Sequence, residues 1–235
     1  MEKMAKPKNA ASRLYSMLSR LKQIPGTNPC ASSFGGILEV PGSNQMLLLE
    51  RVGRATVLMR RAREQALVLN APEDYLEWFE PVQTAFFNLN LGATLEEFTR
   101  KLTTENMVQL QFCGTWLSEH FSEPELAKVA AAHALEEIDE LIKETKESQM
   151  DESVRQYSLR HLFQIAQALR EHELFGAERV QEEIERTIGS ICFHENEARD
   201  AGEKFWDIVR KVGSLVQPVA GLVNIAHFMK LLPWN

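Results

Sequence analysis

Residues 48–69 read LLERVGRATVLMRRAREQALVL, and small or apolar side chains recur in this stretch at alternating steps of four and three. An alternation kept up over three repeats places the recurring side chains on one face of an α-helix, as in a coiled coil. The pattern predicts one long helix over roughly 43–69. We call the recurring set the seam; it consists of Leu48, Val52, Ala55, Met59, Ala62, Ala66 and Leu69.

The seam has to pack against something, and the sequence allows two partners. Three of its seven positions are alanine, so a second helix can approach more closely than it would against leucine. That helix is either a neighbour in the same chain, which makes the seam part of the core, or a helix of another protein or of a second copy. In the second case the seam is a partner-binding surface.

Helical spacing of apolar residues continues through most of the chain. Helices are expected at about 10–24, 43–69, 73–89, from 94, 104–121, 122–147, 152–173, from 177, and beyond 201. The strand-like run ILEV at 37–40 stands alone and cannot form a sheet. The predicted fold is therefore all-α, an irregular multi-helix bundle or array of helical hairpins with eight or nine helices. Its expected parts are an N-terminal helix and loop (1–42), a bundle (43–200) and a docked C-terminal segment (201–235).

Composition is that of a globular protein. The chain has 235 residues, of which 44% are hydrophobic and 25% charged, so it can bury a sizeable core. Its three cysteines are far apart and form no Cys-x-x-Cys pair, and the first residues contain no apolar run typical of a signal peptide. These features favour the cytoplasm, and no cofactor or metal site is predicted.

Charge is distributed unevenly along the chain. Residues 1–65 hold eleven Lys and Arg against four acids, whereas 119–153 hold eleven acids against three Lys, and the net charge is −7. Within the basic part, Arg51, Arg54 and Arg61 fall on one side of the predicted long helix, where they can contact phosphate. No aromatic residues are interleaved with them, which favours a solvated or ion-paired face over a nucleic-acid site.

Residues 212–229, VGSLVQPVAGLVNIAHFM, contain no charged side chain. On a helical wheel its apolar residues occupy one half, whereas Gly213, Gln217, Gly221 and Asn224 occupy the other. The segment is predicted to dock on the bundle or on a partner, and membrane contact is the alternative. The residues expected to make this contact are Leu215, Val219, Leu222, Ala226 and Met229.

One spacing carries a catalytic hypothesis. Arg155 and His161 are separated by five residues, QYSLR, and this resembles the Arg and His signature of HEPN ribonucleases. The resemblance implies a helical domain in which two protomers pair Arg and His to cleave RNA without a metal; the imidazole would move a proton while the guanidinium holds the phosphate. Gln156 departs from the Asn, Asp or His usual after that Arg. His161 also shares a helical face with Val154 and Ile165, so the competing interpretation is a core histidine.

The sequence favours a non-enzymatic cytoplasmic interaction or adaptor protein that offers the seam or the C-terminal face to a protein partner or to a second copy. Two alternatives stay open at this point. One is an HEPN-like ribonuclease or toxin using Arg155 and His161. The other is a membrane-acting effector using residues 212–234.

Overall fold

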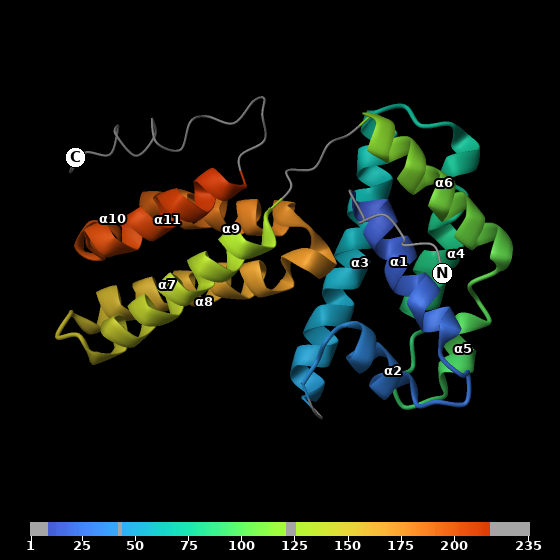
Figure 1. Cartoon of the computed structure of the whole chain (residues 1–235), viewed down its shortest axis with the longest axis horizontal. Helices are drawn as coiled ribbons and strands as arrows, with labels where there is room; N and C mark the ends of the chain where they lie inside the picture. The colour runs from blue at the N-terminus through green and yellow to red at the C-terminus, as the bar shows by residue number, and fades with distance from the viewer. Residues whose placement is uncertain (1–8, 42–43, 121–125, 217–235) are drawn as a thin grey trace. The chain divides into compact units, whose positions relative to one another are not determined.

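The computed structural model describes residues 9–41, 44–120 and 126–216, which form helices joined by turns and loops (Figure 1). Within these ranges there is no strand, only an isolated antiparallel bridge between Pro29 and Thr94. The all-α class is confirmed. The chain divides into two compact units, 1–122 and 123–235, which are described separately. The three-part division predicted from the sequence stays a prediction.

In the first unit, the residues that the structure describes form six α-helices and one 3-10 turn. They are α1 (Ala10–Gln23), α2 (Cys30–Ile37), α3 (Gln45–Val68), η1 (Glu73–Tyr75), α4 (Phe79–Phe87), α5 (Leu95–Thr99) and α6 (Thr104–His120). Helix α1 contacts both α3 and α6, and its apolar face is fully buried. Next to α2, three rings meet edge to face: Phe34 lies 5.0 Å from Phe98, and Phe98 lies 5.4 Å from Phe86. Such contacts stabilise a core beyond the area they bury.

The described residues of the second unit form five α-helices and one 3-10 turn: α7 (Lys128–Glu147), α8 (Glu152–Phe175), α9 (Ala177–Gly189), η2 (Ser190–Cys192), α10 (Glu195–Asp200) and α11 (Glu203–Leu215). Helix α8 packs between α7 and α9, and α11 contacts both of these as well, so four helices enclose one core. Lys204 pairs with Glu144 at 2.8 Å and Lys211 with Glu137 at 2.5 Å, an order that makes α11 antiparallel to α7.

Eleven α-helices in the described residues exceed the eight or nine predicted. The two that the sequence did not indicate are α2 and α10, which are short and contain weak helix formers such as Gly35, Gly36 and Asn196. Tertiary contacts stabilise them. Phe34 anchors α2 in the ring cluster, and the indole Nε1 of Trp206 donates to the carbonyl oxygen of Ala198 in α10 at 2.8 Å.

Candidate functional site

The seam of α3 faces the interior of the first unit. Leu48, Ala55, Met59, Ala62 and Ala66 are buried, and the two remaining members, Val52 and Leu69, are half-buried. Helices α1, α2, α4 and α6 contact α3. The seam is thus covered within its own unit, and the part of α3 that a partner can reach is the opposite side.

That opposite side carries a second helical pattern, which we call the outer stripe. Its residues follow steps of 3, 4, 4, 3, 4 and 3, so they lie on one side of α3. All of them are exposed. Eleven large apolar side chains are exposed in the described residues, and five of these belong to α3. The outer stripe consists of Met46, Leu49, Gly53, Val57, Arg60, Glu64 and Leu67, with Val68 beside it.

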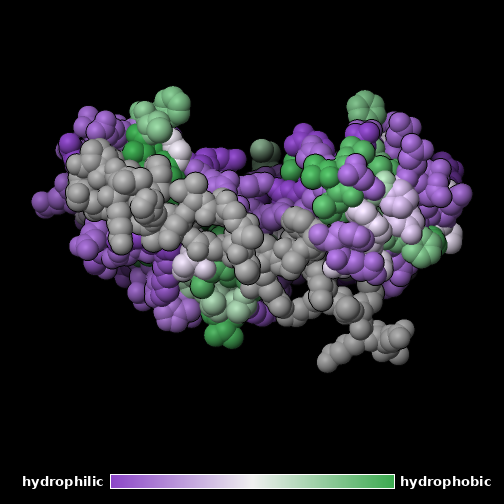
Figure 2. All heavy atoms as spheres, turned by 90° about the horizontal axis from the view of Figure 1, so that it is seen from above, coloured by the Kyte–Doolittle hydropathy of each residue, from purple (hydrophilic) through white to green (hydrophobic). Residues whose placement is uncertain are grey.

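Apolar side chains at the surface, green in Figure 2, occur in both units. On the outer stripe they are not isolated. Leu49, which lies one helical turn before Gly53, is 55% exposed, and Val57, which lies one turn after it, is 43% exposed. Between Val57 and Leu67 the stripe is polar, and Arg60 pairs there with Glu64 at 3.6 Å. The stripe therefore alternates apolar and charged segments along a 24-residue helix.

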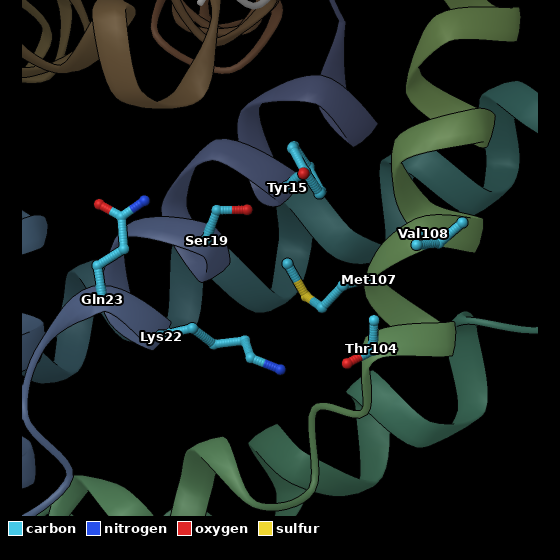
Figure 3. A pocket seen from close by; sticks show the side chains of 7 residues that line it. All are labelled: Tyr15, Ser19, Lys22, Gln23, Thr104, Met107 and Val108. Atoms are coloured by element: carbon cyan, nitrogen blue, oxygen red, sulfur yellow. The ribbon is translucent and has the colours of Figure 1, made fainter. Parts of the chain in front are cut away.

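A shallow groove of about 300 Å³ separates α1 from α6 in the first unit (Figure 3). Tyr15, Ser19, Lys22 and Gln23 line it from α1, and Thr104, Met107 and Val108 line it from α6. The ammonium group of Lys22 donates to the carbonyl oxygen of Leu102 at 2.5 Å, and its side chain extends toward Thr104 in Figure 3. The one cation of this lining is therefore engaged with backbone.

The groove closes where the two helices touch. Asn9 caps α1 by accepting from the backbone N–H of Ser12 at 2.9 Å, and its amide donates to the carbonyl oxygen of Gly114 in α6 at 2.9 Å. A Cβ atom on Gly114 would lie 3.0 Å from the hydroxyl oxygen of Ser12 and 3.1 Å from its backbone nitrogen. A side chain at position 114 therefore forces Ser12 and its backbone to move by a few tenths of an ångström, and glycine lets α1 and α6 approach closely at this crossing.

The three arginines proposed for phosphate contact have partners in the structure. The guanidinium of Arg51 donates to the carbonyl oxygens of Leu38 and Glu39, the latter at 2.7 Å, and so satisfies the carboxyl end of α2. Arg54 pairs with Glu50 at 2.5 Å. Arg61 also has an interaction partner. These contacts give Arg51 and Arg54 structural roles, and the prediction of a nucleic-acid partner stays untested.

Replacing Arg51 by methionine is expected to lower the free energy of unfolding by about 1 to 2 kcal/mol, because the carbonyl groups at the end of α2 lose a charged donor. Urea denaturation followed by circular dichroism measures this loss. Arg60, which is exposed and pairs with Glu64 of its own helix, is the control: Arg60→Met should change stability by less than about 0.5 kcal/mol, the typical value of such a pair. Equal losses for the two variants would contradict the capping role.

His161 is 3% exposed in the core of the second unit, as the core interpretation predicts. The hydroxyl group of Thr187 donates to the carbonyl oxygen of Glu183 at 2.8 Å, so its oxygen can only accept from Nδ1 of His161, 3.2 Å away. This assigns the ring proton to Nδ1. Nε2 then accepts from the guanidinium of Arg160 at 3.4 Å.

Burial, and next to it the charge of Arg160, lower the pKa of His161 to about 4. The ring is therefore neutral at physiological pH. Arg155 has other partners: it pairs with Glu152 and donates to the carbonyl oxygen of Ser148 at 3.4 Å. The Arg and His of the HEPN-like spacing are not joined around a solvent-exposed site, so the structure adds no support to the ribonuclease hypothesis, which stays untested.

Most of the predicted C-terminal contact residues lie outside the described part of the chain. Leu215, at the end of α11, packs against the core of the second unit. Val219, Leu222, Ala226 and Met229 are not described. Among the helices that the structure does describe, none has the length and apolar character needed to cross a bilayer. The described residues also contain no group of three His, Cys, Asp or Glu side chains placed to hold a metal ion.

Sequence reasoning passed over the outer stripe. The sequence does contain a sign of it. A second set of apolar residues in the same stretch, Leu49, Val57 and Leu67, lies one or more positions away from the residues of the seam. Periodicity alone does not say which of two stripes faces inward when both recur at helical spacing. In the structure the more regular pattern, the seam, belongs to the core, and the less regular one stays at the surface.

Comparisons with protein-family models, with curated proteins and with solved structures find no match for this chain.

Proposed function

We propose that the protein is a helical interaction protein that binds a partner helix along the outer stripe of α3. The observation that carries the proposal is the gathering of five exposed large apolar side chains on this one helix. Scattered apolar side chains are normal on protein surfaces, but several of them gathered along one helix are typical of a binding site. A helix is the natural occupant, because residues three and four positions apart present ridges that fit the grooves of another helix.

Gly53 supports a close contact with that occupant. It lies in the interior of α3, where glycine costs roughly 1 kcal/mol relative to alanine. Apart from its own turn of α3, nothing in the described part of the chain lies within 4 Å of the position a Cβ atom would take, so the fold of the unit does not require glycine there. A missing side chain on the exposed side of a helix instead leaves a hole that a residue of a partner can fill.

The charged part of the stripe supports a defined orientation. Arg60 and Glu64 are 66% and 63% exposed, and their pair contributes little to stability on the free surface. Beside an apolar contact, the same charges disfavour any partner that places a like charge opposite them. The outer stripe therefore combines apolar area for affinity with charges for selection of the partner.

Site-specific photo-crosslinking tests the proposal. Benzoyl-phenylalanine at position 57 of the full chain is expected to give a discrete cross-linked product in expressing cells, and the Leu49→Asp substitution should remove it. The matched control places the crosslinker at Val129, an 83% exposed apolar residue of α7 in the second unit, where no product that depends on Leu49 should form.

Mass spectrometry of the product then identifies the residue captured. The interaction surface is supported if the captured residue belongs to a helix of the partner and if the product disappears with Leu49→Asp. If position 57 gives no product, or one that Leu49→Asp leaves intact, the outer stripe is not the binding surface and the proposed function is wrong.

A further inference from the structure

We infer that the partner helix on the outer stripe is α3 of a second copy of this chain, packed antiparallel about a two-fold axis that passes between Gly53 and Val57. The inference rests on the proposed function and names its partner. It is carried by the order of residues along the stripe, which is complementary to itself when reversed.

The centre of the stripe fits its own copy. Gly53 lies two residues before position 55 and Val57 two residues after it, and both are exposed on the same side of α3. A two-fold axis at the level of residue 55 therefore brings each Gly53 to the height of the partner's Val57. The isopropyl group of valine enters the space left by the missing side chain, twice in one interface. This explains a glycine that the isolated unit does not need.

Charges around the centre give the orientation. Within one copy Glu50 pairs with Arg54, and Arg60 pairs with Glu64. Glu50 lies five residues before position 55 and Arg60 five residues after it, so the same axis brings the paired Glu50 of each copy to the height of the paired Arg60 of the other. Arginine can bridge the width of such a contact, because it has a long side chain with several donors. In a parallel pair in register, Glu50 would face Glu50 and Arg60 would face Arg60. The like charges disfavour that arrangement, so the pair is antiparallel.

The ends of the stripe also meet apolar groups. Leu67 of one copy lies beyond Met46 of the other by three helical residues, about 4.5 Å along the helix axis. Met46 is 77% exposed and flexible enough to span that distance. At each end of the pair, Met46 of one copy packs against Leu67 and Val68 of the other. The charged segments lie between these apolar ends and the centre, where Gly53 meets Val57.

The mass of the full chain in solution tests the inference, measured by light scattering during gel filtration over a range of concentrations. The parent should be a dimer. Val57→Asp should be a monomer, since it places two negative charges, one from each copy, near the axis, whereas Val129→Asp, the same substitution on the exposed apolar residue of α7, should remain a dimer. Gly53→Ala should weaken the dimer while raising the melting temperature of the monomer, because alanine fills the hole and favours the helix.

A charge exchange tests the register. Glu50→Arg and Arg60→Glu should each raise the dissociation constant at least about tenfold, and the double variant should restore most of the affinity, because its charges are opposite again. Circular dichroism at 222 nm checks that each variant keeps its helical content.

Each remaining outcome overturns the inference. A parent that stays monomeric at all concentrations excludes the second copy, while a cross-link from position 57 to a different protein would still support the proposed function. A dimer that tolerates Val57→Asp uses another surface. A double variant that fails to recover excludes this antiparallel register. If position 57 gives no cross-link, or one that Leu49→Asp leaves intact, both proposals are rejected together.

Discussion

Lowering the pH from 7 to 5 is expected to reduce the free energy of unfolding of the second unit by roughly 2 kcal/mol through His161 alone. The histidine has a pKa of about 4 in the folded protein, because it is buried and lies beside Arg160, and 6.5 is its ordinary value. Folding thus favours the neutral ring. The contribution is fully present above pH 6.5 and is lost as the pH falls from 6.5 toward 4, to a total of about 3 kcal/mol.

His161→Gln separates this effect from general acid denaturation. Glutamine does not titrate in this pH range. The variant should be less stable than the parent at pH 7, because the hydrogen bond to Thr187 and the ring contacts with Tyr157 and Phe205 are disturbed. Its stability should then depend less on pH between 7 and 5 than that of the parent. The expected loss at pH 7 is about 2 kcal/mol, typical of a buried polar group with disturbed partners.

Hydrogen exchange of amides in α8 measures these changes within the second unit, and urea denaturation at each pH measures them globally. His133→Gln is the control substitution, since the His133 side chain is 63% exposed on α7. Nuclear magnetic resonance of the His161 ring reports its titration directly. A ring that titrates near 6.5, or a His161→Gln variant with the full pH dependence of the parent, would contradict the assignment.

The case of His161 also shows what a sequence pattern can and cannot predict. Its place on the face of Val154 and Ile165 predicted a core histidine, and the structure confirms this. The reason it is tolerated there lies in residues far away in the sequence. Thr187 accepts from the ring only because its own proton is donated to Glu183 within α9. No spacing around residues 155–161 contains that information.

Long helices were predictable because their apolar spacing persists over many residues. The predicted helix at roughly 43–69 is α3 at Gln45–Val68, and that at 104–121 is α6 at Thr104–His120. The run ILEV at 37–40, which looked like a lone strand, instead ends α2: Ile37 is its last residue, and Glu39 has a φ of 56°. Contacts of Phe34 with other rings, not local propensity, decide that segment.

Only part of the candidate site was accessible to the same reasoning. The seam was recognised because its seven residues repeat regularly, but the surface that remains free depends on which side of α3 the other helices cover. Leu49 and Val57 are outside because α1, α2, α4 and α6 contact α3 on the side where Ala55, Met59 and Ala62 are buried. Which side of α3 is covered depends on how the whole unit packs, because the short side chains of the seam let neighbouring helices approach α3 closely on that side.

The close crossing of α1 and α6 carries the largest expected loss of stability in the first unit. Gly114→Val is expected to lower the free energy of unfolding by about 3 kcal/mol, at the upper end of the range for overpacked sites. Even the Cβ atom would lie 3.1 Å from the backbone nitrogen of Ser12, and the two methyl groups add further volume. Because a backbone atom cannot move alone, the whole of α1 has to shift. The amide of Asn9 then loses its contacts with Gly114, at 2.9 Å, and Ser118, at 2.8 Å.

Gly53→Val is the matched control, because the same substitution in another helix meets open space. Measured at a concentration that keeps the chain monomeric, it should be neutral or slightly stabilising, since valine is a better helix former than glycine. Urea denaturation of both variants, followed at 222 nm, gives the comparison. If Gly114→Val matched Gly53→Val, α1 would not be held against α6 by the contacts of Asn9 and Ser12. A large loss confined to Gly114→Val instead shows that this crossing sets the spacing of α1 and α6, and with it the width of the groove between Lys22 and Thr104.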